Sequence, residues 1–166
     1  YISDLEEKGI RASARAAIET GTCLHFHTGA GTMGLEIIEI VEQEGLELDR
    51  VIIAHVDRFP DWGYHKKMLE KGVNIIYDGP GKAKYYPDSM RVDLIKKIIE
   101  HGFEKQLMLS NDMGRRSHHK VYGYGPGFEF IPTKFIPRLL EEGVSQNSID
   151  NFMIHNPARV YSLKEK

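Results

Sequence analysis

Two histidines and one aspartate stand at the carboxyl ends of apolar segments that have the composition of buried strands. The segments cover residues 22–27, 51–55 and 106–112, and they end at His27, His55 and Asp112. Parallel strands of a (β/α) barrel carry their catalytic groups at this end, so we expect the three side chains to converge. Imidazole nitrogen and carboxylate oxygen are common ligands of a hydrolytic Zn²⁺. The pattern therefore predicts a metal site made of these three residues.

A fourth candidate, His25, lies two residues before His27, so alternation along a strand puts both side chains on the same face. His27 is nearer the strand end and is the better ligand, whereas His25 is expected to pack one layer deeper. A single histidine at a strand end is more often a hydrogen-bonded structural residue than a ligand. Three equivalent positions together, and the cost of burying Asp112 without a cation, favour metal binding.

Glycines and apolar segments alternate along the chain in the order expected of β-α units. Five glycines follow polar helical stretches and are predicted helix C-caps: Gly21, Gly45, Gly72, Gly102 and Gly143. Apolar runs after the first four suit strands buried on both faces of a parallel sheet. Ser3 and Glu6 form a capping-box pattern at the start of the first helix. Pro132 is expected to open a later helix, and Asn156 to be the N-cap of a short terminal one.

This order predicts a parallel α/β architecture. Four strands do not close an eight-stranded barrel, which usually needs ~250 residues. The chain is therefore either a small open sheet or the second half of a barrel whose first half lies upstream. The metal-ligand pattern, and a first residue, Tyr1, that is not methionine, favour the half barrel.

Composition excludes several classes of protein. The 166 residues are 41% hydrophobic, and 22 basic against 24 acidic residues leave a net charge of −2. This balance gives no reason to expect a nucleic-acid or membrane partner, and we expect a small-molecule substrate and allow for a homodimer. Cys23 is the only cysteine, which excludes a disulfide framework and an all-cysteine zinc site. We expect a cytoplasmic location, because no apolar stretch approaches the ~18 residues of a membrane helix.

Four short motifs occur in order over nearly the whole chain: Phe26-His27-Thr28-Gly29, the segment 50–57 (RVIIAHVD), Leu109-Ser110-Asn111-Asp112 and Asn156-Pro157-Ala158-Arg159. This ordered set resembles the phosphotriesterase family of the amidohydrolase superfamily. The resemblance implies a (β/α)8 TIM barrel with two divalent metals, usually zinc, bridged by a carboxylated lysine and a hydroxide. The family's first-strand His-x-His and its bridging lysine have no counterpart here. Residues 1–166 are therefore expected to form the C-terminal half of one barrel domain, strands five to eight.

Carried over to this chain, the resemblance assigns His27 and His55 to one metal and Asp112 to the other. A metal-bound hydroxide would attack a carbonyl or phosphoryl centre. Asp112 would take its proton and pass it to the leaving group.

Two loops after the last two predicted strands carry candidate substrate-binding residues. Their basic residues, Lys82, Lys84, Arg115 and Arg116, could form a cationic clamp for an anionic substrate, and Tyr77, Tyr85, Tyr122 and Tyr124 could line the pocket. Family members that resemble this chain include lactonases, some of which act on phosphorylated furanose lactones. We therefore expect a lactonase for a phosphorylated sugar lactone, with Lys84 and Arg115 foremost at the phosphate. The alternatives are phosphotriester, other ester or amide hydrolysis at the same site, or a non-catalytic sugar-phosphate-binding module.

Overall fold

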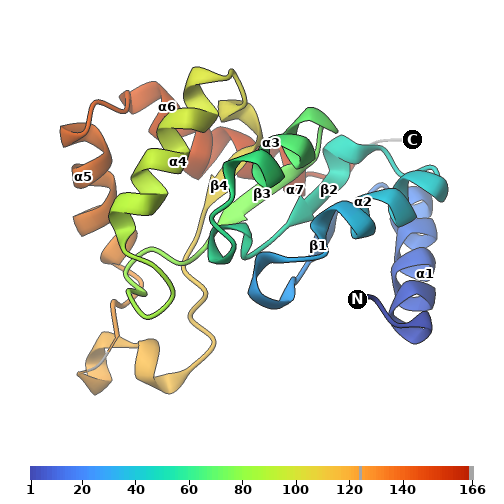
Figure 1. Ribbon diagram of the computed structural model, residues 1–166, viewed down its shortest axis with the longest axis horizontal. Helices are drawn as coiled ribbons and strands as arrows, with labels where there is room; N and C mark the ends of the chain where they lie inside the picture. Colours follow the sequence, from blue (N-terminus) through green and yellow to red (C-terminus); the bar gives the residue numbers. More distant parts are fainter. Residues whose placement is uncertain (124, 165–166) are drawn as a thin grey trace.

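Four parallel strands lie side by side in sequence order at the centre of the structure, a computed structural model that describes residues 1–123 and 125–164 (Figure 1). They are β1 (Leu24–Phe26), β2 (Val51–Ile53), β3 (Asn74–Tyr77) and β4 (Leu107–Leu109). In the register, Leu24 pairs with Val51, Ile53 with Ile75, and Tyr77 with Leu109. The parallel α/β prediction is confirmed. The strands are shorter than predicted, so the expected metal ligands lie in the loops that follow them.

Helices connect and flank the strands. They are α1 (Asp4–Thr20), α2 (Gly34–Gln43), α3 (Trp62–Glu70), α4 (Asp88–Glu100), α5 (Ile136–Glu141), α6 (Gln146–Asp150) and α7 (Asn156–Tyr161). The capping box of Ser3 and Glu6 is present, and all five predicted cap glycines have positive φ, as expected of helix ends. Among the described residues, no helix combines the length and the apolar character needed to cross a membrane.

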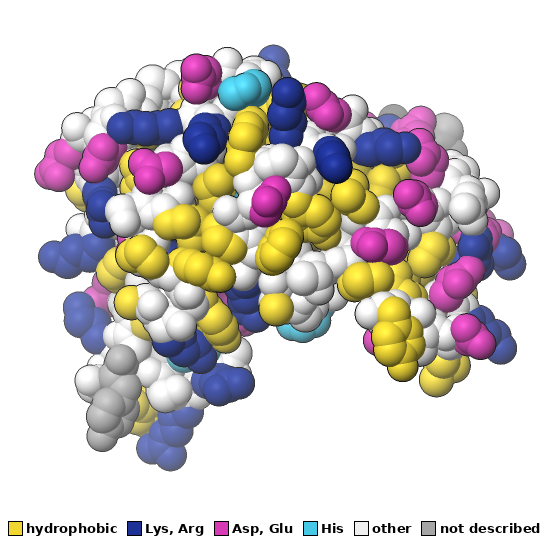
Figure 2. Space-filling view, viewed as in Figure 1, with side chains coloured by type: hydrophobic (Ala, Val, Ile, Leu, Met, Phe, Trp, Pro, Cys, Tyr) yellow, Lys and Arg dark blue, Asp and Glu magenta, His cyan; other side chains and the backbone are white. Residues whose placement is uncertain are grey.

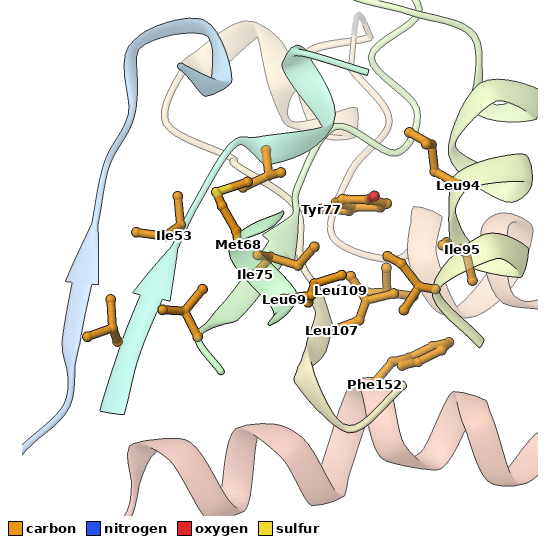
Figure 3. Packing of buried hydrophobic residues seen from close by; sticks show 14 of the residues in the cluster. Ile53, Met68, Leu69, Ile75, Tyr77, Leu94, Ile95, Leu107, Leu109 and Phe152 are labelled. Carbon is orange, nitrogen blue, oxygen red and sulfur yellow. The ribbon is translucent and has the colours of Figure 1, made fainter. Parts of the chain in front are cut away.

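The two faces of the sheet bury different side chains because successive residues of a strand point in opposite directions. On the outer face, Ile53, Ile75, Tyr77, Leu107 and Leu109 pack against the helices in the main core. Figure 3 shows this layer, with Leu94 and Ile95 of α4 and Met68 and Leu69 of α3 packed against the strands. On the other face, Ile52, Ile76 and Met108 form a small cluster with Val160 of α7. The open end of that inner face is where the candidate ligands project.

Asn156 is not the helix N-cap that the sequence predicts. Its backbone is helical (φ −66°, ψ −50°), because α6 continues through a π-helical turn, Asn151–His155, directly into α7. The Asn156 side chain is buried and donates to the carbonyl oxygens of Glu104 (2.9 Å) and Leu107 (2.7 Å). These bonds hold α7 against the start of β4. The Asn156 side chain therefore makes a long-range contact in place of the local helix cap that the sequence predicts.

Two arginines complete this attachment at the amino end of the sheet. Buried Arg50 donates to the carbonyl oxygens of Gly21 (3.1 Å) and Ser162 (2.6 Å). Arg159 of α7 donates to the side chain of Asn74 (2.8 Å) at the start of β3. Arg50 is the first residue of the motif 50–57 and Arg159 is the last residue of the motif 156–159. Both therefore stabilise the end of the sheet opposite the candidate site.

We expect Asn156→Ala to lower the free energy of unfolding by about 1–3 kcal/mol, because two backbone carbonyls lose their donor at a buried position. Urea unfolding of the full-length protein measures this. Asn147→Ala is the matched control, because Asn147 is exposed on α6. Equal stability of the two variants would contradict the role given to Asn156.

Candidate active site

His27 and His55 lie in contact at the carboxyl end of the sheet. His27 follows β1 by one residue and His55 follows β2 by two, so neighbouring parallel strands bring the imidazoles together. Nδ1 of His27 and Nε2 of His55 are 2.7 Å apart, with the two rings nearly perpendicular. The structure thus brings together two of the three residues predicted to bind metal.

Asp78 holds the His55 ring in place. Its two carboxylate oxygens lie 2.8 and 2.7 Å from Nδ1 of His55, and one of them also accepts the His55 backbone N–H at 3.1 Å. A carboxylate on Nδ1 favours the tautomer that carries its proton there, which leaves the Nε2 lone pair facing His27. Sequence reasoning missed Asp78, although it follows the apolar run 73–77 directly, as His27 follows its own run.

The backbone of His55 is in the left-handed region (φ 64°, ψ 18°), which is uncommon for a residue other than glycine. Gly31 makes this close packing feasible, since a Cβ there would lie 2.7 Å from the His55 carbonyl oxygen. Thr28 is buried nearby and donates its hydroxyl to the Ala54 carbonyl oxygen (2.7 Å). The turn after His27 is therefore built around the end of β2. Strained backbone held by its surroundings is frequent at functional sites.

Asp112, three residues beyond β4, is bound by two cations. Nη2 of Arg58 lies 2.6 Å from its Oδ2, and Nζ of Lys82 lies 3.2 Å from the same oxygen. Lys82 also donates to the backbone carbonyl oxygen of Asp112. Burial alone would raise the pKa of Asp112, but the hydrogen bond and charge of Lys82, with the charge of Arg58, lower it below its ordinary value. The carboxylate is therefore held in its ionised form.

The donor set fits a divalent metal only in part. His25, His27, His55, Asp78 and Asp112 all line one concave pocket at the end of the sheet. Two facing imidazole nitrogens and a nearby carboxylate are suitable donors for zinc. Within residues 1–123 and 125–164, however, no three His, Cys, Asp or Glu side chains lie close enough together to hold an ion. The described residues therefore supply two imidazole donors and a carboxylate, fewer than a bound metal ion needs.

A second pocket lies between the loops that follow β3 and β4. Its wall contains Lys82, Lys84, Ser117 and His118. The His118 ring lies 3.1 Å from the Asp112 carbonyl oxygen, and Lys82 contacts Asp112 as well, so this pocket adjoins the one that contains the histidines. His118 was not among the predicted site residues, although it lies in the basic run that carries Arg115.

The other predicted clamp residues are exposed. The Lys84 ammonium lies 4.6 Å from the ring centre of Tyr85, and the Arg116 guanidinium lies 4.2 Å from that of Tyr122. Arg115 is also exposed, and it does not line the second pocket. Figure 2 shows Lys and Arg side chains gathered on the lower left of the molecule, over the segment between β4 and α5.

Tyr77 does not lie at this site, contrary to the prediction. It is fully buried on the outer face of β3, and its hydroxyl donates to Nδ1 of His65 (2.7 Å). Alternation explains the error, since Ile76 and Asp78 point inward and the residue between them must point to the helices. Of the other predicted pocket tyrosines, Tyr124 lies outside the described residues.

Behind the site, a buried ion pair ties the ends of β2 and β3 together. Asp57 and Arg91 are both fully buried, with Nε of Arg91 2.5 Å from Oδ2 of Asp57. Asp57 also accepts the backbone N–H groups of Asp78 (3.3 Å) and Gly79 (3.0 Å). A side chain on Gly79 would collide with this pair. The ion pair therefore positions Asp78, the residue that holds His55.

Buried His65 fixes the loop after His55. Its Nε2 donates to the carbonyl oxygens of Phe59 (2.7 Å) and Val56 (3.0 Å), while Nδ1 accepts from Tyr77. Burial lowers the pKa of His65 below its ordinary value, although the two backbone contacts act in the opposite direction. The imidazole is therefore neutral in the folded protein near neutral pH.

Comparison with known proteins gives consistent matches. The model of the phosphotriesterase family matches residues 1–161. A phospho-furanose lactonase of Mycoplasmopsis synoviae is 36% identical over 99% of this chain and 48% of its own length. The crystal structure of a lactonase from Listeria monocytogenes superposes with a TM-score of 0.95 at 42% identity, covering 99% of this chain and 52% of that one. The phosphotriesterase homology protein of Escherichia coli, crystallised with phosphate in its active site, superposes with a TM-score of 0.95 at 36% identity over 98% of this chain and 56% of that one. The chain spans about half the length of these relatives.

The lowered pKa of His65 makes stability depend on pH. The unfolded-state pKa of histidine is about 6.5, so below this pH the His65 imidazole is protonated in the unfolded chain and still neutral in the folded protein. The free energy of unfolding therefore falls as pH decreases through this value. His65→Gln keeps an amide donor for the loop and removes the titration. We expect it to be less stable at pH 7.5 by about 1–3 kcal/mol but to lose less stability between pH 7.5 and 5.5 than the wild type. Unfolding free energies at both pH values measure this, and identical pH slopes would contradict it.

Proposed function

Because this chain belongs to the phosphotriesterase family, we propose that it is the C-terminal half of a metal-dependent hydrolase barrel that opens a phosphorylated sugar lactone. The observation that carries the proposal is the position of a cationic pocket directly beside Asp112. Lys82 and His118 contact Asp112 and also line that pocket. An anionic group bound there would place the rest of a small substrate over the histidine-lined pocket.

The half-barrel assignment has two supports. The four strands occur in sequence order in one parallel sheet, which is the arrangement of consecutive strands in a (β/α)8 barrel. The chain also spans 48% of the Mycoplasmopsis relative and 52% of the Listeria one. The remaining strands would come from the other half, together with the ligands that His27 and His55 need.

In the intact enzyme, His27 and His55 would hold one divalent metal and Asp112 would contribute to a second, most simply zinc in both places. A bound metal would supply the Lewis acidity that polarises the lactone carbonyl and acidifies water. Asp78 keeps the His55 proton on Nδ1, so that Nε2 is available as a donor atom. A carboxylated lysine bridging the two metals would come from the missing half.

Asp112 is the proposed general base. As a carboxylate it accepts the proton of the attacking water, and as the carboxylic acid it returns that proton to the ring oxygen when the C–O bond of the lactone breaks. The net reaction adds one water across the ester bond and yields a hydroxy acid. Asp112 lies three residues beyond β4 and lines the pocket, a position that suits transfer of the proton from the water oxygen to the ring oxygen of the lactone.

The cationic pocket is the proposed phosphate site. The Lys84 ammonium and the hydroxyl and ring nitrogens of Ser117 and His118 are suitable partners for phosphate oxygens, and Arg115 and Arg116 stand on the same loop. A neutral organophosphate would gain little from such a pocket. The substrate class that these side chains favour is therefore an anionic lactone.

The test is a substrate panel with the full-length protein: phosphorylated sugar lactones, the same lactones without phosphate, neutral phosphotriesters and N-acyl amides. We expect carboxylate release mainly from the phosphorylated lactones. Lys84→Met should raise KM for them about 10–100-fold, as expected for a lost charge-assisted hydrogen bond, and should leave KM for the unphosphorylated lactones nearly unchanged. Turnover of phosphotriesters or amides alone would contradict the assignment, and sugar-phosphate binding without any turnover would favour a non-catalytic binding module.

Asp78→Asn is expected to weaken metal binding about 10–100-fold, because the amide no longer fixes the His55 tautomer. Competition of the apoprotein with a chromogenic zinc chelator measures the affinity without using turnover. Asp93→Asn is the control, because Asp93 is an exposed carboxylate on α4. Unchanged affinity in Asp78→Asn would refute the role of Asp78.

A further inference from the structure

We infer that Arg58 and Lys82 are positioning residues for Asp112, which they hold by one carboxylate oxygen so that the two lone pairs of the other remain available for the proposed metal contact and for proton transfer. The inference rests on the proposed function and removes Lys82 from the phosphate clamp in which the sequence placed it. Both cations contact Oδ2 of Asp112, and neither of these contacts uses Oδ1.

Arg58 is built into its position. It closes the short turn Val56–Arg58 that follows His55, and its side chain is only 11% exposed. The guanidinium lies 4.7 Å from the ring centre of Tyr85, and Nη2 is 3.8 Å from Asp78 on one side and 2.6 Å from Asp112 on the other. A planar cation held between a ring and two carboxylates has little freedom to follow a substrate, but it can fix a neighbouring side chain.

Lys82 and Lys84 have different surroundings although they are two residues apart. The Lys82 side chain is 3% exposed, and its ammonium binds both the side chain and the backbone carbonyl of Asp112. Lys84 is exposed at the rim of the second pocket. The two lysines therefore have different roles: Lys82 positions the general base Asp112, and Lys84 binds the phosphate group of the substrate.

Asp112 needs such support because of where it stands. It lies three residues beyond the last hydrogen-bonded residue of β4, at the start of the long connection to α5. A general base must stay within hydrogen-bond reach of the proton it removes, and a displacement of about 1 Å can reduce the rate about 100-fold. Buried Lys82 and partly buried Arg58 contact one oxygen and thereby set the orientation of the carboxylate, which lies beyond the hydrogen bonds of the strand.

Kinetics of the full-length enzyme with a phosphorylated lactone separate the two tasks. We expect Arg58→Met and Lys82→Met to lower kcat about 10–100-fold with KM changed less than about threefold. Lys84→Met, the matched control, should raise KM with kcat nearly unchanged. Lys82→Arg should recover most of the kcat lost in Lys82→Met, because it restores the cation. A rise in KM at unchanged kcat in Lys82→Met would overturn the inference and return Lys82 to the clamp.

A readout without turnover separates this inference from the proposed function. If Arg58 holds Asp112, the melting temperature of the double variant Arg58→Met/Asp112→Asn should fall by clearly less than the sum of the two single effects, by roughly 3 °C or more. Additive shifts would overturn the inference even in an active enzyme. Failure of the wild type to hydrolyse any phosphorylated lactone, with non-additive shifts, would overturn the substrate assignment and support the contact.

Discussion

The geometry of the site depends on the hydrogen bonds and the ion pair that the buried carboxylate of Asp57 forms. It accepts the backbone N–H groups of Asp78 and Gly79 and pairs with Arg91, so one side chain joins β2, the turn after β3 and α4. A buried pair of this kind is costly to break, because the remaining charge is left without a partner. Asp78 then sets the ring of His55. The candidate metal donor is thus positioned by a carboxylate that never touches it.

Side chains alternate between the two faces of the short parallel strands, so core residues and site residues lie on different faces. Tyr77 belongs to the core and Asp78 to the site, although they are adjacent, because successive side chains leave opposite faces of the sheet. The outer face therefore needs large apolar groups, and the inner face can carry polar ones at its open end. The loops after β3 and β4 lie beside that end, where Lys82 contacts Asp112 and Lys84 lies at the rim of the second pocket.

Features that depend on neighbours in the chain could be predicted from the sequence. The capping box of Ser3 and Glu6 and the left-handed glycines at helix ends form through contacts within a few residues. Apolar runs between them suffice to predict parallel strands. Because such strands all end at one edge of the sheet, the ends of those runs also predict that His27 and His55 meet.

Features that depend on distant segments were decided only by the tertiary structure. Asn156 has the local pattern of a helix cap, but its amide binds the start of β4 about fifty residues earlier, which no local rule reveals. Lys82 stands in a loop whose basic residues suggest phosphate binding, but it is buried and pairs with Asp112 instead. Sequence therefore determined which residues could do chemistry and at which end of the sheet, because helix caps and strand ends are local. The fold determined which charges meet, because ion pairs and buried hydrogen bonds form between segments that only folding brings together.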